Sequence, residues 1–316
     1  MTLAAQVLPM PDIQNDFTWS KSRHERFKEC RRAYWYAYYG SWGGWEAPPG
    51  TSARELYVLK KLSSRWQWAG SLVHGALKQM LTRARATGDV RALDDLLRQT
   101  RSRARAQWAS SREKSYWREP SPRSGLVEHE YGEPVADAEW KRVWEETVEG
   151  SLRAFYASET WDRIRRVPVA RWLCVDELDS WQFEGTKVWV AVDFAYVESD
   201  GRVTLLDWKT GKERGVDHVQ VGIYALYAKV KWRVGPDQVA GGLVYLGSPD
   251  APRVSVAAHP DALDACRAEM RASISAMRGL LDAPESNLAA SPDRFPMLEE
   301  RQACQRCPFR RPCGRI

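Results

Sequence analysis

The spacing of hydrophobic residues changes near residue 165 of the chain. Before that point apolar residues recur at helical intervals, as at Phe27, Cys30 and Tyr34. This spacing predicts a helix over residues 20–39, with Cys30 on its inward face. Further helices are expected over residues 53–85, 91–117 and 136–161.

After residue 165 the sequence is rich in Val, Trp, Tyr and Phe, which are favoured in strands. Strands are predicted over residues 169–178, 181–184, 186–198 and 202–209. A helix over residues 217–232, a strand over residues 239–246, a short strand near Val254 and a helix over residues 260–281 follow. This pattern indicates an α/β fold whose sheet carries the chemistry.

The length of 316 residues allows one elaborated domain or two small ones. Residues 1–84 are interpreted as an N-terminal helical segment, and residues 85–165 as a helical insertion. Residues 166–316 contain the predicted sheet and a C-terminal group of cysteines. We expect the three parts to form one composite domain.

The formal net charge of +6 is unevenly distributed. Residues 81–118 contain ten Lys or Arg against four Asp or Glu, whereas residues 124–150 contain eight acids against two bases. The basic stretch is a candidate phosphate-binding surface, and the alternative is an ordinary solvated helix.

The start of the chain lacks the basic and apolar segments of a signal peptide. No apolar run approaches the length of a membrane span. A cytoplasmic protein with no membrane partner is therefore expected.

Two aspartates and a lysine form the clearest candidate centre. A three-residue loop over residues 199–201, with Gly201 in the left-handed conformation, would join the two strands that carry them. In that register Asp193 lies opposite Asp207, with Cβ atoms about 5 Å apart, and Lys209 points to the same face. A two-residue loop would instead place the two acids on opposite faces.

Two carboxylates this close repel each other unless a cation lies between them. Their oxygens, together with the backbone carbonyl of Trp208, suit Mg²⁺ or Mn²⁺. Such a metal would polarise a scissile phosphate and activate a water, while Lys209 would stabilise the developing negative charge. The alternative is a surface ion pair, but Leu205 and Leu206 make this strand apolar on both faces.

The motifs Asp207-Trp208-Lys209 and Gln220-x-x-x-Tyr224 resemble the RecB-like branch of the PD-(D/E)XK nuclease superfamily. The resemblance implies a restriction-endonuclease-like core, which is a mixed central sheet flanked by helices. It implies that Asp193, Asp207 and Lys209 are catalytic, and that the other two motif residues lie near them. Gln220 and Tyr224 would share one face of the following helix.

Two further residues enter through the same resemblance. The motif Gly70-x-x-x-His74 is similar to the family's metal-binding histidine on an upstream helix, and Glu177 is a candidate additional acid. The implied activity is metal-dependent hydrolysis of DNA, on single strands or ends, in DNA repair, recombination or genome defence. A helicase or another defence or repair protein is the implied partner.

Four cysteines form a second constellation, with Cys304, Cys307 and Cys313 near the C-terminus and Cys30 near the other end. Four thiolates suit either zinc or a [4Fe-4S] cluster, and the spacing does not choose between them. The same arrangement in AddB, the exonuclease V group and CRISPR-associated RecB-like nucleases implies the iron-sulfur cluster. Zinc and unligated thiols are the alternatives.

A function of a different class is also open. The chain would then be a non-catalytic iron-sulfur subunit that binds DNA or scaffolds a helicase-nuclease or defence complex. The intact set of Asp193, Asp207 and Lys209 argues against this alternative.

Overall fold

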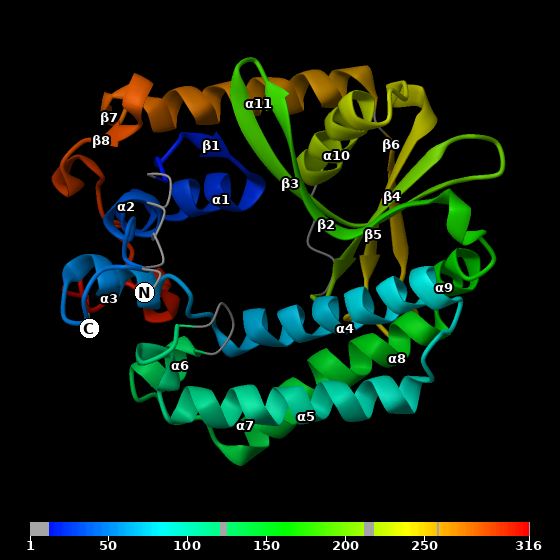
Figure 1. Ribbon diagram of the computed structural model, residues 1–316, viewed down its shortest axis with the longest axis horizontal. Coiled ribbons are helices and arrows are strands. Elements are labelled where there is room, and N and C mark those ends of the chain that lie inside the picture. Colours follow the sequence, from blue (N-terminus) through cyan, green and yellow to red (C-terminus); the bar gives the residue numbers. More distant parts are fainter. Residues whose placement is uncertain (1–12, 121–124, 212–217, 258, 316) are drawn as a thin grey trace, which may run out of the picture.

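A mixed six-stranded sheet lies at the centre of the protein, and helices surround it (Figure 1). The computed structural model describes residues 13–120, 125–211, 218–257 and 259–315. The sheet strands are β1 Thr18–Trp19, β2 Trp172–Phe183, β3 Thr186–Val197, β4 Val203–Lys209, β5 Val239–Tyr245 and β6 Arg253–Ala257.

The strands follow the order β1-β3-β4-β5-β6, and β2 also pairs with β3. Neighbours β2 and β3, β3 and β4, and β5 and β6 are antiparallel, whereas β4 and β5, and β1 and β3, are parallel. Helix α10 (His218–Lys231) connects the parallel strands β4 and β5, as a parallel pair requires a crossover. The predicted mixed sheet with flanking helices is confirmed.

The helices fall into three groups along the chain. The N-terminal group comprises α1 Lys21–Glu29, α2 Arg31–Trp35, the π-helix Tyr36–Gly40, α3 Ser52–Leu59 and α4 Arg65–Thr87. The middle group comprises α5 Leu93–Arg112, α6 Val127–Glu130, α7 Asp137–Arg142, the π-helix Val143–Glu149, α8 Gly150–Ala157 and α9 Glu159–Ile164. The third group is α10 and α11 Pro260–Arg278, before the small hairpin β7 Leu281–Ala283 and β8 Leu288–Ala289. None of the helices described in these ranges is long and apolar enough to cross a membrane.

The prediction of a single helix over residues 20–39 is wrong, because the helix is interrupted at Cys30. This residue has an extended backbone, with φ −160° and ψ 116°, and separates α1 from α2. The N–H of Arg32, freed at the start of α2, donates to the carbonyl of Pro296 at 3.2 Å. A contact with the C-terminal part of the chain therefore satisfies this helix end, which no local pattern reveals.

Other predicted boundaries also need correction. The segments expected over residues 169–178 and 181–184 are one strand, β2, whose pairing with β3 continues through Asp179 and Ser180. The helix over residues 53–85 is two helices, because Ser64 caps α4 in a capping box with Gln67. The helix over residues 91–117 ends at Arg112, after which Lys114 has a left-handed backbone (φ 51°).

The helix predicted over residues 136–161 is also interrupted. Ser158 has an extended backbone and its side chain accepts a hydrogen bond from the N–H of Trp161, so it caps α9. The start of the helix predicted over residues 217–232 lies outside the described residues at position 217.

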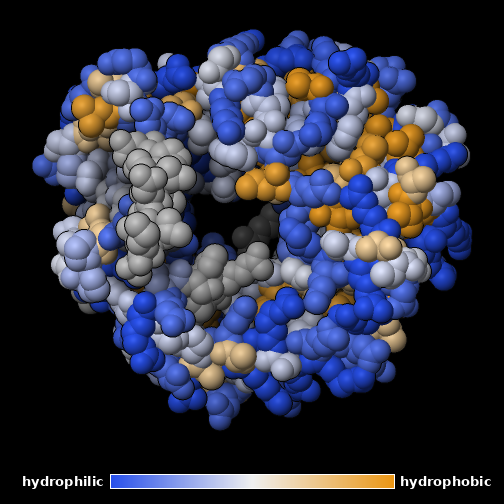
Figure 2. Space-filling model, viewed as in Figure 1, coloured by the Kyte–Doolittle hydropathy of each residue, from blue (hydrophilic) through white to orange (hydrophobic). Residues whose placement is uncertain are grey.

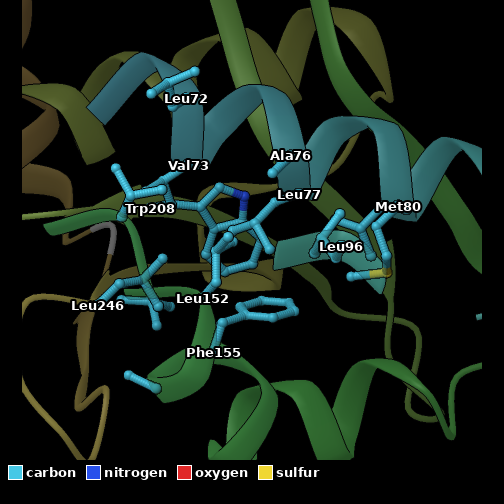
Figure 3. Close-up of a cluster of buried hydrophobic side chains, with 14 of the residues drawn as sticks. Leu72, Val73, Ala76, Leu77, Met80, Leu96, Leu152, Phe155, Trp208 and Leu246 are labelled. Carbon is cyan, nitrogen blue, oxygen red and sulfur yellow. The ribbon is translucent and has the colours of Figure 1, made fainter. Parts of the chain in front are cut away.

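One hydrophobic core joins the middle helices to the sheet. Phe155 of α8 is fully buried, and its ring meets that of Trp208 on β4 edge-on at 5.2 Å (Figure 3). Leu72 and Leu77 of α4 lie in the same cluster as Leu152 of α8. Helix α4 thus packs between the sheet and the middle helices.

The molecule is hollowed at its centre on the face shown in Figure 2. In the same view the sheet borders this hollow on one side and α4 borders it on another (Figure 1). Side chains from both can therefore face one space.

Leu152→Ala should lower the free energy of unfolding by about 2–5 kcal/mol, because Leu152 is fully buried in the core shared with the sheet. The matched change Leu178→Ala removes a side chain that is 70% exposed and should have an effect below about 0.5 kcal/mol. Urea titrations followed by circular dichroism and by tryptophan fluorescence measure both. Two separate transitions would contradict a shared core.

Candidate active site

The hairpin of β3 and β4 has the predicted register. The N–H of Glu198 donates to the carbonyl of Arg202 at 2.8 Å, Gly201 has φ +87°, and Phe194 pairs with Leu206. One position further along, Asp193 and Asp207 stand on facing strands. Both residues are buried, with relative exposures of 7% and 5%.

Asp193 is held from two sides. Its Oδ2 accepts a hydrogen bond from the backbone N–H of Trp208 at 2.7 Å, and its Oδ1 lies 3.1 Å from Nδ1 of His74. His74 comes from the middle of α4. Burial lowers the pKa of His74, but the carboxylates of Asp193, Asp207 and Asp176 outweigh it and raise that pKa to about 9.

Asp207 is held by the helix that follows β4. Tyr224 Oη donates to Asp207 Oδ1 at 2.8 Å, and Gln220 Nε2 also donates to this oxygen. The other oxygen, Oδ2, lies 2.8 Å from Lys209 Nζ, yet it is buried and accepts no hydrogen bond of good geometry from a described residue. Burial, reinforced by the Asp193 carboxylate, raises the pKa of Asp207.

Gln220 links the acidic and basic sides of the site. Its Nε2 donates to Tyr224 Oη at 2.8 Å, which the spacing of four residues on one helix allows. Its Oε1 accepts from Lys209 Nζ at 2.6 Å and from Lys21 Nζ at 3.2 Å. Lys21 belongs to α1, and the sequence carries no signal that would have assigned it here.

Glu177 is not brought to this centre. Its side chain is exposed and lies 2.9 Å from Nη1 of Arg85. The acid beside Asp193 is instead Asp176, whose pKa is raised by burial and by Asp193, against the opposing charge of Lys78. Asp176 has φ 45°, a costly conformation within a strand.

A turn signal in the sequence could have identified Asp176 as the acid beside Asp193. Glu184 and Gly185 both have positive φ and form a two-residue hairpin turn, so that Phe183 pairs with Thr186. Counting back from this turn places Asp176, and not Glu177, at the level of Asp193.

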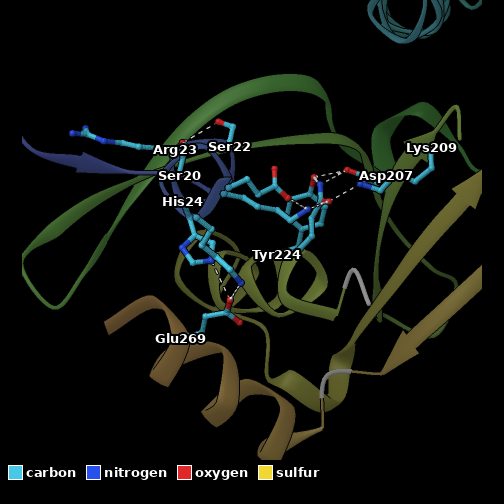
Figure 4. Close-up of polar contacts among 12 residues, drawn as sticks. Ser20, Ser22, Arg23, His24, Asp207, Lys209, Tyr224 and Glu269 are labelled. Carbon is cyan, nitrogen blue, oxygen red and sulfur yellow. Dashed lines mark hydrogen bonds and ion pairs between the residues drawn. The ribbon is translucent and has the colours of Figure 1, made fainter. Parts of the chain in front are cut away.

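One pocket of about 990 Å³ at the centre of the molecule is lined by His74, Asp193, Asp207, Lys209, Gln220 and Tyr224. Figure 4 shows Asp207, Lys209 and Tyr224 together, with Ser20 at the start of α1. Leu178 and Trp189 form an apolar part of the wall. The described arginines on the exposed face of α5, which are Arg98, Arg101 and Arg105, do not line it.

The four cysteines that the sequence suggests as cluster ligands lie together, away from the central pocket. Cys30, Cys304, Cys307 and Cys313 are free thiols that line one small cavity. Burial, together with the neighbouring thiols, raises the pKa of Cys307 to about 11. Within the described residues, no set of three or more His, Cys, Asp or Glu side chains is arranged to hold a metal ion.

Ion pairs anchor the segment that carries these cysteines. Arg310 Nη2 lies 2.6 Å from Glu133 Oε1, and Arg311 pairs with Glu55 at 3.0 Å and with Glu130 at 2.8 Å. The C-terminal segment is thus attached to α3, to α6 and to the loop after α6.

Comparison with known proteins agrees with this geometry. A family model described as the PD-(D/E)XK nuclease superfamily matches residues 18–314, which is nearly the whole chain. No curated protein matches the chain. With a match of this length, the chain belongs to the PD-(D/E)XK nuclease superfamily, whose members are generally nucleases and typically use Mg²⁺ or Mn²⁺.

Proposed function

We propose that this protein is a metal-dependent DNA nuclease of the RecB-like branch. The observation that carries the proposal is the convergence of Asp193, Asp207, Lys209 and His74 on one pocket. Two acids buried at facing positions form a costly arrangement that nearby cationic groups only partly offset, and such arrangements concentrate at catalytic sites.

The chemistry of the donor atoms at this site suits a hard divalent cation. Asp207 Oδ2 is buried and lies 2.8 Å from the Lys209 ammonium, but it accepts no hydrogen bond of good geometry from a described residue, so a metal ion could take up this oxygen. Asp193, Asp207, His74 and the backbone carbonyl of Trp208 would hold Mg²⁺ or Mn²⁺. When bound, the metal supplies Lewis-acid polarisation of a phosphate and a more acidic water.

The protein's own groups orient the site and supply charge. The Lys209 ammonium stands beside Asp207, where it can stabilise negative charge that develops on a phosphate. Gln220 and Tyr224 hold Oδ1 of Asp207 and so fix the direction of its second oxygen. In this proposal Asp176, and not Glu177, is the additional acid.

Apolar residues in the pocket wall support single-stranded DNA or DNA ends as the substrate. Leu178 is 70% exposed and Trp189 is half-buried, and both line the pocket. Apolar and aromatic surfaces beside a phosphate site can stack unpaired bases at about 1–3 kcal/mol per base. The family resemblance extends the proposal to DNA repair, recombination or genome defence in the cytoplasm, beside a helicase or another defence or repair protein.

We further propose that Cys30, Cys304, Cys307 and Cys313 hold a [4Fe-4S] cluster. The support is that four free thiols from opposite ends of the chain line the same cavity. Such a cluster would have a structural role, because it would join the start of α2 to the C-terminal segment.

Wild-type protein should cleave end-labelled single-stranded DNA with Mg²⁺ or Mn²⁺, and Asp207→Ala should abolish cleavage because it removes a central carboxylate. Lys209→Ala should lower kcat by about 10²–10³-fold through loss of charge stabilisation. Chelation with EDTA should stop the reaction, and added Mg²⁺ should restore it. Gel analysis of the labelled products measures each effect.

The matched control is Asp200→Ala, which removes an exposed aspartate from the turn of the same hairpin and should leave cleavage unchanged. Cleavage that survives Asp207→Ala would contradict the proposed site. Absence of cleavage in a folded wild-type protein would favour the non-catalytic DNA-binding subunit.

With a [4Fe-4S] cluster, the wild-type protein should absorb visible light and contain iron. Cys30→Ser should remove this absorbance and most of the bound iron. Loss of a link between the two ends of the chain should also lower the free energy of unfolding, by on the order of 5 kcal/mol in the chain-entropy picture. Cys174→Ser is the matched control, because Cys174 lies in the sheet away from this cavity. Elemental analysis that finds zinc, or no metal, in the wild-type protein would exclude the cluster.

A further inference from the structure

A second lysine reaches the candidate active site from the N-terminal helix. Lys21 is the first residue of α1, directly after Ser20, whose Oγ caps the helix by accepting from the N–H of Arg23 at 3.1 Å. Its Nζ donates to Gln220 Oε1 at 3.2 Å and its side chain lines the central pocket. Lys21 stands outside the motifs Asp207-x-Lys209 and Gln220-x-x-x-Tyr224.

Gln220 holds the two lysines at the same point. Its amide nitrogen is committed to Asp207 and Tyr224, so its oxygen must face the opposite side. There Oε1 accepts from Lys209 and Lys21, which uses both of its lone pairs. The ammonium groups thus converge beside Asp207.

Two ammonium groups that share one neutral oxygen repel each other, so an anion near both is favoured. Asp207 provides that charge for Lys209 at 2.8 Å. One carboxylate that pairs with Lys21 is Glu25, one turn along α1 at 2.9 Å, with a side chain that is 59% exposed. An ion pair with a solvent-exposed partner contributes little to stability, so another anion can readily displace Glu25.

Arg23, another cationic residue near the start of α1, has its guanidinium occupied by contacts within the protein. Arg23 is 4% exposed, and its guanidinium donates to Tyr34 Oη at 2.9 Å and to Tyr39 Oη at 3.2 Å. Figure 4 shows Arg23 at the start of α1 beside Ser20 and Ser22. Arg23 also lines this pocket, but its guanidinium is held by the two tyrosines and fixes the helix start, whereas the Lys21 ammonium contacts Gln220 in the pocket.

We propose that Lys21 is a phosphate-binding residue of this site, and that a phosphate oxygen of the substrate strand replaces Glu25 at its ammonium group. The inference rests on the proposed nuclease function and adds to it a specific contact made by α1. It makes α1 part of the substrate-binding surface.

The test is the salt dependence of DNA binding in an Asp207→Ala background, with a fluorescent single-stranded oligonucleotide as the probe. Lys21→Met keeps most of the aliphatic stem but removes the charge. Loss of one phosphate contact should make the slope of log Kobs against log[salt] less steep by about 0.7 for single-stranded DNA. Lys21→Arg should keep the parent slope.

Lys28→Met is the matched control, because Lys28 lies on the same helix, is 65% exposed and pairs with Glu269 outside the pocket. It should leave the slope unchanged. Glu25→Gln should strengthen binding, because it removes the carboxylate that competes with phosphate. Circular dichroism melts of each variant separate loss of the contact from loss of the fold.

The outcomes separate the two proposals. If wild-type protein cleaves DNA and Lys21→Met keeps the parent slope, the Lys21 assignment is overturned and the nuclease function stands. If Lys21→Met reduces the slope but wild-type protein does not cleave, Lys21 is a phosphate contact in a protein without nuclease activity. A parent protein that binds no DNA at all overturns the Lys21 assignment.

Discussion

The structure depends on the burial of two carboxylates at facing positions of one hairpin. Asp193 and Asp207 are almost inaccessible to water, so each loses hydration while it repels the other. Groups on three elements compensate for this cost. Helix α4 contributes His74, strand β4 contributes Lys209, and α10 contributes two hydrogen-bond donors to Asp207.

This requirement explains why distant segments meet around a central pocket. His74 approaches Asp193 from α4, whereas Gln220 and Tyr224 approach Asp207 from α10. The core behind the site holds these approaches in place, since Phe155 packs on Trp208, whose N–H binds Asp193. A substitution that disturbs the packing of residues 85–165 would therefore also disturb the position of Asp193.

The two ends of the chain meet beside α1 and α2. The chain is extended at Cys30, between these helices, and the C-terminal cysteines line the same cavity. Helix α1 leads from this cavity to the central pocket, where Lys21 contacts Gln220. The same short stretch thus connects the cysteine cavity to the acidic centre.

The sequence by itself determined the features that follow from periodicity within one element or one turn. Gly201 sets the hairpin register, and the spacing of Gln220 and Tyr224 places both on one helix face. Packing between elements decided the helix interruption at Cys30 and the position of Lys21 in the central pocket, because both depend on contacts with distant residues. Period-two and period-3.6 patterns carry no information about which distant segment supplies a partner.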